Sequence, residues 1–390
     1  MSGRRLSDVV SVGVLTRAFP PELVDEVIAQ AGRTEQRHRS LPARVMAYFA
    51  IGMALHSEGS YEDVLGLLSD GLAWSAVEEP VKLPSKSAIF QARARLGAAP
   101  VRALFERVAV PLAAPGAGGA WLAGRRLVAI DGTCLDVADT TENDEFFGRP
   151  GVNKGERAAF PQARVVAVAE CGTHVVFDAA VGAYTTPENT LAREVIDRLE
   201  PGTLLLADRG FCGFPLWNRA VGVGVDLLWR AMPNMKPRYV QTLADGSWLA
   251  ELRPSGNAGR TAEPLTIRVI DYEITDGRAN ENTYRLFTTL LDPDEAPAVD
   301  LALAYAQRWE IEATFDELKV HQRGPRTVLR SKSPDLVLQE IWGHLCCHFA
   351  IRTLMWEAAG AAGVDPDRVS FVAALRIARR SIPAARDFPP

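Results

Sequence analysis

The residues from 305 to 319 have the spacing of a chemical site. No Pro or Gly interrupts this stretch and most of its residues favour helix, so we expect one continuous helix. At roughly 100° of turn per residue, Tyr305, Arg308, Glu312 and Lys319 lie within a stripe about 60° wide. A carboxylate flanked by cations suits a site that binds both metal and phosphate. An ordinary salt-bridged helix face is the alternative, since Arg308 and Glu312 form an i,i+4 pair.

Two further carboxylates favour the metal site. Asp131 ends the apolar run 127–130 and Asp208 ends the apolar run 203–207, and a Gly follows each acid within two residues. An acid at the tip of a buried strand is costly unless something pairs with it. We therefore expect Asp131, Asp208 and Glu312 to converge on divalent metal.

Three other acids on the same predicted helix compete with Glu312. Glu310 and Glu317 lie roughly 140–200° around the helix from it and should face away. Asp316, one turn further on, is the serious competitor.

The chemistry that these residues predict is phosphodiester cleavage by two metal ions. Hard carboxylate oxygens suit two Mg²⁺ or Mn²⁺ ions, which together activate an oxygen nucleophile and stabilise the leaving oxyanion. We expect Asp131 and Asp208 to share both ions and Glu312 to complete one of them. Arg308 and Lys319 would hold phosphates. The sequence contains no GxxxxGK[ST] motif, so we expect no nucleotide cofactor.

With these motifs in order along the chain, the sequence resembles the DDE transposases of the insertion-sequence-4 family. The first motif matches at 130–133, the second at 207–211, and the third, Tyr-x2-Arg-x3-Glu-x6-Lys, at Tyr305, Arg308, Glu312 and Lys319. The similarity runs from about residue 14 to about residue 382. The resemblance implies cutting and joining of DNA, with transposon terminal inverted repeats and target DNA as partners and a dimer in the synaptic complex.

Composition limits the other possibilities. The chain has 390 residues, of which 47% are hydrophobic and 23% charged, and this predicts a soluble globular protein of two or three domains. The formal net charge of −5 does not favour DNA binding, so binding must depend on local basic patches. The five cysteines include no CxxC pair, and neither a membrane-spanning run nor a signal peptide is evident. We expect a cytoplasmic protein associated with the bacterial nucleoid.

Residues 1–112 predict a helical, helix-turn-helix-like DNA-binding domain. Its most basic helix begins after an N-cap Ser at 85, continues through a basic stretch and stops at the Gly at 97. A basic, solvated helix face is the alternative. The family resemblance implies that this segment helps to recognise the ends of the element. The candidate DNA contacts are Lys86, Arg93 and Arg95.

The fold class predicted for the rest is α/β (α+β), with an RNase H-like catalytic core. After a Gly/Ala/Pro-rich linker at 113–125, residues 126–231 show three strands and then helix, strand, helix, strand, which is the order of that fold. Its first and fourth strands bring their acids side by side. We expect strands at 126–137, 163–169, 173–179, 204–208 and 225–231, helices at 187–199 and 214–221, and a long loop at 138–162.

Residues 232–298 predict a β-rich insertion, because alternating segments are separated by turn signals. The resemblance implies that it holds the DNA end and stacks an aromatic ring on a displaced base. Trp248 and Trp229 are the candidates, with ordinary core packing as the alternative for each.

The remaining segments complete the core and the chain. Residues 299–333 carry the third acid, and 334–390 predict packing helices. A basic segment follows the third motif and suits phosphate binding. Together with Arg209 beside the second acid, the candidate DNA contacts of this part are Arg323, Arg326, Arg330 and Lys332.

Two other functions remain compatible with the sequence. A domesticated relative would bind DNA without cutting it, although the intact acids argue against this. An RNase H-like nuclease would cut without strand transfer, but would need neither the third-motif face nor the β insertion.

Overall fold

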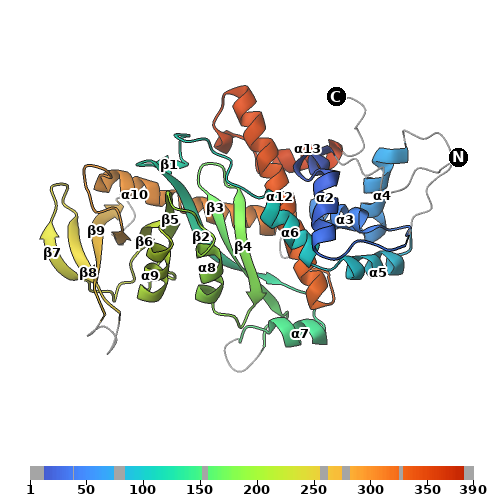
Figure 1. Ribbon diagram of the computed structural model, residues 1–390, viewed down its shortest axis with the longest axis horizontal. Coiled ribbons are helices and arrows are strands. Elements are labelled where there is room, and N and C mark those ends of the chain that lie inside the picture. The colour runs from blue at the N-terminus through green and yellow to red at the C-terminus, as the bar shows by residue number, and fades with distance from the viewer. Residues whose placement is uncertain are drawn as a thin grey trace.

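The structure is organised around one long mixed sheet (Figure 1). The computed structural model describes residues 13–37, 39–73, 84–151, 157–254, 262–274, 282–324 and 328–381. Within these ranges the strands form a 10-stranded sheet in the order β4-β3-β2-β5-β6-β10-β9-β8-β7, with β1 (Trp121–Leu122) added beside β2. None of the helices in these ranges is both long and apolar enough to cross a lipid bilayer.

The first half of the sheet has the RNase H-like order. β2 pairs antiparallel with β3 and parallel with β5, while β3 pairs with β4 and β5 with β6. Three antiparallel strands followed by two parallel ones confirm the predicted fold class. The strands are β2 (Arg125–Asp136), β3 (Gln162–Glu170), β4 (Val176–Ala183), β5 (Thr203–Ala207) and β6 (Asp226–Arg230).

The β-rich insertion extends this sheet. β10 (Asn282–Thr288) pairs antiparallel with β6, and β9 (Leu265–Ile274), β8 (Trp248–Leu252) and β7 (Arg238–Thr242) follow in turn. The sequence analysis missed β7. All five of its residues are exposed, so it lacks the apolar alternation that identifies a half-buried strand.

Helices cover the two faces of the core separately. α8 (Glu188–Ile196) and α9 (Phe214–Gly222) pack with one set of strand residues, which includes Val128 and Ile130. Leu127 and Ala129, which point to the other face, belong to the larger core with the N-terminal helices and the C-terminal half of the chain. This alternation along β2 is the period of two that a strand buried on both faces must show.

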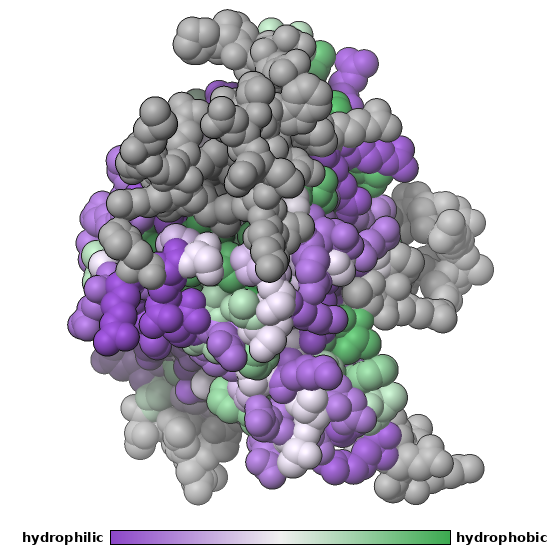
Figure 2. Space-filling view, turned by 90° about the vertical axis from the view of Figure 1, so that its right-hand side faces the viewer, coloured by the Kyte–Doolittle hydropathy of each residue, from purple (hydrophilic) through white to green (hydrophobic). Residues whose placement is uncertain are grey.

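The N-terminal helices share their core with a long C-terminal helix. α12 (Pro334–Ala362) packs across α3 (Ala43–Leu55) and α6 (Ala99–Val108), and nearly every residue of α3 is buried. The domain division around 113–125 therefore stays a prediction. Hydrophilic side chains predominate on the visible surface at this end of the molecule (Figure 2). The other helices here are α1 (Gly13–Ala18), α2 (Pro21–Gln30), α4 (Tyr61–Ala73), α5 (Lys86–Leu96), η4 (Pro366–Arg368) and α13 (Phe371–Ser381).

Two capping motifs that are visible in the sequence, Ser60-x-x-Asp63 and the Ser85 cap of the basic helix, both form in the structure. Ser60 and Asp63 form a reciprocal capping box at the start of α4, with N–H to oxygen distances of 2.9 and 3.1 Å. The Ser85 hydroxyl accepts a hydrogen bond from the N–H of Ala88, and α5 ends at Gly97, whose φ is +73°.

The predicted continuous helix at 305–319 is wrong. α10 (Ala298–Ala306) ends before a tight turn, α11 (Trp309–Asp316) follows, and η3 (Glu317–Gln322) is a π-helix. At the break the N–H groups of Gln307 and Arg308 bond three residues back, at 3.0 and 3.1 Å. Tertiary contacts of the third-motif side chains, described below, override the local preference for helix here.

The predicted long loop at 138–162 also contains a helix. α7 (Thr141–Phe147) is capped by Thr140, whose hydroxyl accepts from the N–H of Asn143 at 3.3 Å. It spans only seven residues, too few for a clear 3.6-residue pattern.

The crossing of α12 and α3 predicts a sensitive position. A Cβ added at Gly343 of α12 would overlap the carbonyl oxygen of Ala50 in α3. We expect Gly343→Ala to lower the free energy of unfolding by about 1–3 kcal/mol, because backbone must move to admit the methyl group. Urea denaturation of the full chain measures this change.

Gly360 gives the matched control in the same helix. Nothing lies within 4 Å of a Cβ added there, so Gly360→Ala should leave stability unchanged or raise it by up to about 1 kcal/mol. Equal effects of the two substitutions would contradict the close packing of α12 on α3.

Candidate active site

The first two predicted acids lie at the same level of neighbouring strands. The last pair in the parallel register of β2 and β5 is Ile130 with Ala207. Asp131 and Asp208 are the next residues on each chain, and adjacent strands are about 4.8 Å apart. By the alternation of side chains, both project toward the face that carries the larger core. The two acids therefore lie on neighbouring strands, as expected, but only Asp208 follows a strand end, because β2 continues past Asp131 to Asp136.

Asp131 is a partly buried carboxylate whose pKa is raised. Its Oδ1 accepts the N–H of Gly132 at 2.8 Å. Burial raises the pKa of Asp131 to about 6, and the like charges of Asp208 and Glu188 add to this effect. The Gly132 hydrogen bond and the Arg308 guanidinium oppose the rise without cancelling it.

Arg308 links Asp131 to Glu312. Its Nη2 donates to Glu312 Oε1 at 2.9 Å, and its Nη1 lies 3.9 Å from Asp131 Oδ2. Arg308 as a whole is 6% exposed, and its guanidinium is positioned between two carboxylates from different elements. In this arrangement the oxygens of Asp131, Asp208 and Glu312 do not all lie within 4.8 Å of one another.

The other two residues of the third motif also contact the sheet. The buried Tyr305 hydroxyl donates to the carbonyl oxygen of Ala207 at 3.2 Å, and burial raises its pKa, so the hydroxyl stays neutral. Lys319 Nζ donates to the hydroxyl of Thr133 at 2.9 Å. The side chains of the predicted stripe thus contact the middle of β2 and the end of β5, although more than one helical element carries them.

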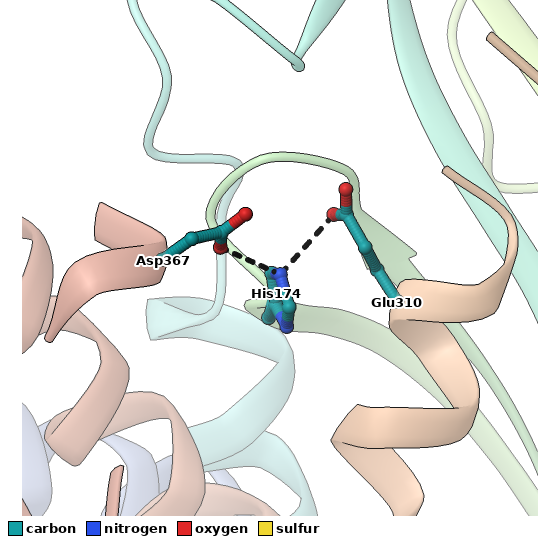
Figure 3. Close-up of side chains that lie close together, drawn as sticks. All are labelled: His174, Glu310 and Asp367. Carbon is teal, nitrogen blue, oxygen red and sulfur yellow. Dashed lines mark ion pairs between the residues drawn. The ribbon is translucent and has the colours of Figure 1, made fainter. Parts of the chain in front are cut away.

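Glu310 faces away from the acids, as expected. Its Oε2 accepts the N–H of Gly172 at 2.6 Å and lies 3.3 Å from His174 Nε2, which lies 3.0 Å from Asp367 Oδ1 (Figure 3). These are the only described residues whose potential metal-binding atoms all lie within 4.8 Å of one another. The cluster attaches α11 to the turn between β3 and β4 and to η4.

Glu317 also faces away and fixes the end of the same segment. Its carboxylate accepts from Arg352 Nε at 2.9 Å and lies 3.0 Å from His348 Nε2, both on α12. Two of the three rival acids are thus occupied elsewhere, whereas Asp316 is exposed on α11.

A basic pocket of about 450 Å³ joins two segments that are distant in sequence. Lys86 from α5 and Arg330 and Lys332 from the segment after the third motif line it, beside the rings of Tyr61 and Phe90. The Arg330 guanidinium lies 4.9 Å from the centre of the Tyr61 ring, and Phe90 is 44% exposed. Cations beside exposed aromatic rings form a surface that suits a nucleic-acid backbone and bases.

A second pocket of about 210 Å³ lies next to the second acid. It is lined by Arg209, which follows Asp208, and by Arg230 and Arg285 from β6 and β10. Arg285 is paired with Asp271 at 2.7 Å, whereas Arg230 stacks 4.2 Å from the centre of the Tyr284 ring. The insertion therefore contributes one cation, Arg285, to a pocket whose other two arginines come from the core.

Three predicted contacts are wrong because their side chains are buried. Arg93 is 0% exposed and donates to Gln339, Tyr61 and Ser331, so it holds α5 to the C-terminal half. Arg323 is 5% exposed. Trp229 is fully buried, with its ring 5.3 Å from that of Trp217, and cannot stack on a displaced base.

Other predicted contacts stay predictions. Arg95 is exposed and Trp248 is half-buried on β8, where the Arg285 guanidinium lies 5.6 Å from its ring centre. Arg326 lies outside the described residues.

Two charged residues near the acids were missed by the sequence analysis. Arg230 ends β6, at the same sheet edge as Asp208, and only the pairing of β6 with the insertion places it in the pocket. Glu188 lies in the first turn of α8, and its charge acts on Asp131. The sequence placed Glu188 in the first turn of a helix, but no sequence pattern indicated that this helix start lies beside β2.

Comparisons with known proteins identify the family of this chain through two family models and one relative. A family model described as insertion element 4 transposase N-terminal matches residues 9–106, and one described as transposase DDE domain matches residues 122–350. The transposase InsG for insertion sequence element IS4 of Escherichia coli (strain K12) is 31% identical over 354 residues, which cover 90% of this chain and 78% of that protein. The solved piggyBac transposase synaptic complex with hairpin DNA is 12% identical with a TM-score of 0.48, over 95% of this chain and 80% of that one.

The pKa of Asp131 predicts a stability that depends on pH. A folded-state pKa of about 6 lies above the ordinary value of about 4, so the stability contribution is present below pH 4 and is lost as the pH rises through 6. Asp131→Asn removes this loss. Without divalent cations, we expect the variant to be more stable than the wild type at pH 7.5 by on the order of 2 kcal/mol, and equal to it near pH 4.

Urea denaturation across this pH range measures the difference. Asp316→Asn, which changes an exposed acid of α11, should show no such pH-dependent gain. A variant Asp131→Asn that is less stable than the wild type at pH 7.5 would contradict the electrostatic picture of the site.

Proposed function

Since the chain belongs to the insertion element 4 family of DDE transposases, and is a DNA transposase, we propose that Asp131, Asp208 and Glu312 are its catalytic acids. The observation that carries this proposal is that Asp131, in the middle of β2, and Asp208, just past the end of β5, follow the last residue pair of these two strands, with Arg308 between Asp131 and Glu312. Two acids are thus held by the rigid sheet, and the third is carried by a short helix facing them.

The residues present fit divalent metal ions, which transposase DDE domains use. The donor set consists of hard carboxylate oxygens, which suit two Mg²⁺ or Mn²⁺ ions. Burial and the neighbouring carboxylates of Asp208 and Glu188 raise the pKa of Asp131, and a bound cation would favour its charged form. When bound, the ions would supply Lewis acidity that activates the attacking oxygen and stabilises the charge on phosphorus.

Arg308 would change partners during this process. In the structure it neutralises part of the charge of Asp131 and Glu312. Once cations hold the carboxylates, its planar guanidinium would be free to bind a phosphate through two parallel hydrogen bonds. Lys319 would hold a second phosphate as a point charge, and the neutral Tyr305 hydroxyl would support the end of β5 through Ala207.

The reaction would proceed in two steps at one site. Water first hydrolyses the phosphodiester at the end of the element and frees a 3′-OH. This 3′-OH then attacks a phosphodiester of target DNA, forming one new bond and releasing one strand end. No covalent enzyme intermediate is needed.

The DNA would contact two basic surfaces. The pocket with Lys86, Arg330 and Lys332 and the pocket with Arg209 and Arg230 together offer phosphate sites on the N-terminal helices and beside the acids. By similarity to the relative for insertion sequence element IS4, the substrates would be the terminal inverted repeats of an insertion sequence and a target DNA. Bringing two ends together favours a dimer on DNA, and the protein would act in the cytoplasm at the nucleoid.

Removal of any one acid should stop cleavage. We expect Asp131→Ala, Asp208→Ala and Glu312→Ala each to reduce cleavage of end-bearing DNA in Mg²⁺ by more than about 1000-fold, because each removes charge stabilisation at the reacting phosphate. DNA binding, measured by mobility shift, should persist. Asp316→Asn is the matched control and should stay active.

The products of the wild-type reaction separate the alternative functions. Joined strand-transfer products support the transposase mechanism. Nicks without joining would indicate a nuclease, and shifts without cleavage a DNA-binding protein that no longer cuts. An active Glu312→Ala enzyme would refute the assignment of the third acid.

The basic pocket at Lys86 predicts a salt-dependent contribution to binding. We expect Lys86→Ala and Lys332→Ala each to weaken DNA binding, and to reduce the slope of log K against log salt by about 1 if each side chain neutralises one phosphate. Fluorescence anisotropy at a series of salt concentrations measures both effects. Arg219→Ala, which removes an exposed cation paired with Asp197 on the α9 side of the molecule, is the control and should change neither.

A further inference from the structure

Glu188 approaches β2 next to Asp131, at Gly132, from the opposite face of the sheet. It begins α8, which packs on the face that Val128 and Ile130 share, whereas Asp131 points to the other face. Beyond Ile130, β2 is no longer paired with β5. The next residue on the α8 face is Gly132, which has no side chain. At this point β2 therefore has one edge without a paired strand and one face that no side chain of its own covers.

Gly132 makes room for this carboxylate. A Cβ added at Gly132 would overlap Oε1 of Glu188, and the Glu188 side chain is the group that this Cβ would meet first. The φ of Gly132 is not in the left-handed region, so backbone conformation does not explain the glycine. The close approach of the Glu188 carboxylate does explain it.

The Glu188 carboxylate is half-buried and lacks a partner. Within the described parts of the chain no donor forms a hydrogen bond or an ion pair with it. Burial raises its pKa; Arg164 acts against this rise, and Asp208 adds to it. The Arg164 guanidinium acts on the Glu188 charge without forming an ion pair with it; it stacks 5.3 Å from the Tyr184 ring centre, and its Nε has no hydrogen-bond partner.

We propose that Glu188 is a fourth carboxylate ligand of the metal site, which it enters from the α8 side of the sheet past Gly132. This inference rests on the proposed function of Asp131 and Asp208. It assigns divalent cations such as Mg²⁺ or Mn²⁺ as the ligand, because the donor is a hard carboxylate oxygen. Glu188 would touch the metal ion rather than the DNA.

The charge of the site supports a fourth ligand. Asp131, Asp208, Glu188 and Glu312 supply four negative charges, and Arg308, Lys319 and Arg164 supply three positive ones. Half-buried like charges without a partner destabilise a fold, so such an arrangement persists where a bound cation compensates for it. The strand ends and two helices on opposite faces would surround the ions.

The test measures Mn²⁺ binding to the full chain by titration calorimetry, without DNA. We expect Glu188→Gln to weaken Mn²⁺ binding roughly 10- to 100-fold, the scale on which losing a supporting group of a metal site acts. Glu194→Gln, an exposed acid on the same helix, should leave the binding unchanged. Without metal, Glu188→Gln should melt at or above the wild-type temperature, since it removes an unpaired charge.

Two further variants keep the test decisive. Gly132→Ala should also weaken Mn²⁺ binding, because the methyl group displaces the Glu188 carboxylate without changing any charge. Asp131→Asn reports on the proposed function itself.

Each outcome separates the two ideas. If Asp131→Asn abolishes Mn²⁺ binding but Glu188→Gln and Gly132→Ala leave it at the wild-type value, the fourth ligand is refuted and the proposed function stands. If Glu188→Gln lowers the melting temperature with unchanged Mn²⁺ binding, the residue pairs with Arg164 for stability, and the inference also fails. If Asp131→Asn itself leaves Mn²⁺ binding intact, the metal site of the proposed function is refuted.

Discussion

The structure depends on an imbalance of charge in the middle of β2. Asp131 is held there by the pairing of β2 with β3, burial raises its pKa to about 6, and the Arg308 guanidinium acts against that rise. Arg308 also bonds to Glu312, so a single cation serves two carboxylates from different elements. The positive charge of the protein thus compensates only part of the negative charge at this site, and such an excess of negative charge favours a divalent cation.

The fold maintains this imbalance by fixing the segment that carries the third motif. On the side away from the acids, Glu310 bonds to the turn between β3 and β4 and Glu317 bonds to Arg352 and His348 of α12. These contacts hold α11 and η3 against the sheet, while Lys319 contacts Thr133 on β2. Glu310 and Glu317 are thus paired with other parts of the fold, whereas Glu312 bonds to Arg308 on the side of Asp131.

The elements near the acids were predictable because their signals are local. The apolar runs that end at Asp131 and Asp208, the order of strands and helices, and the Ser60 and Ser85 caps follow from short stretches of sequence. The break after α10 was not predictable, because nothing between 305 and 319 disfavours helix; the contacts of Tyr305 with Ala207 and of Arg308 with two acids come from elsewhere in the chain. β7 was not predictable either, because all of its residues are exposed and it lacks the apolar alternation of a half-buried strand.

The sequence by itself determined the chemical types at the site: two acids at the tips of apolar strands, and a tyrosine, an arginine, a glutamate and a lysine at a spacing that faces them. Only the tertiary structure decided which charges are available. Arg93 and Lys86 stand on one basic helix, yet Arg93 is buried among Gln339, Tyr61 and Ser331 while Lys86 lines a pocket. Glu188 meets Gly132 only because α8 packs across β2. Burial and proximity arise from contacts between distant segments, which no local pattern encodes.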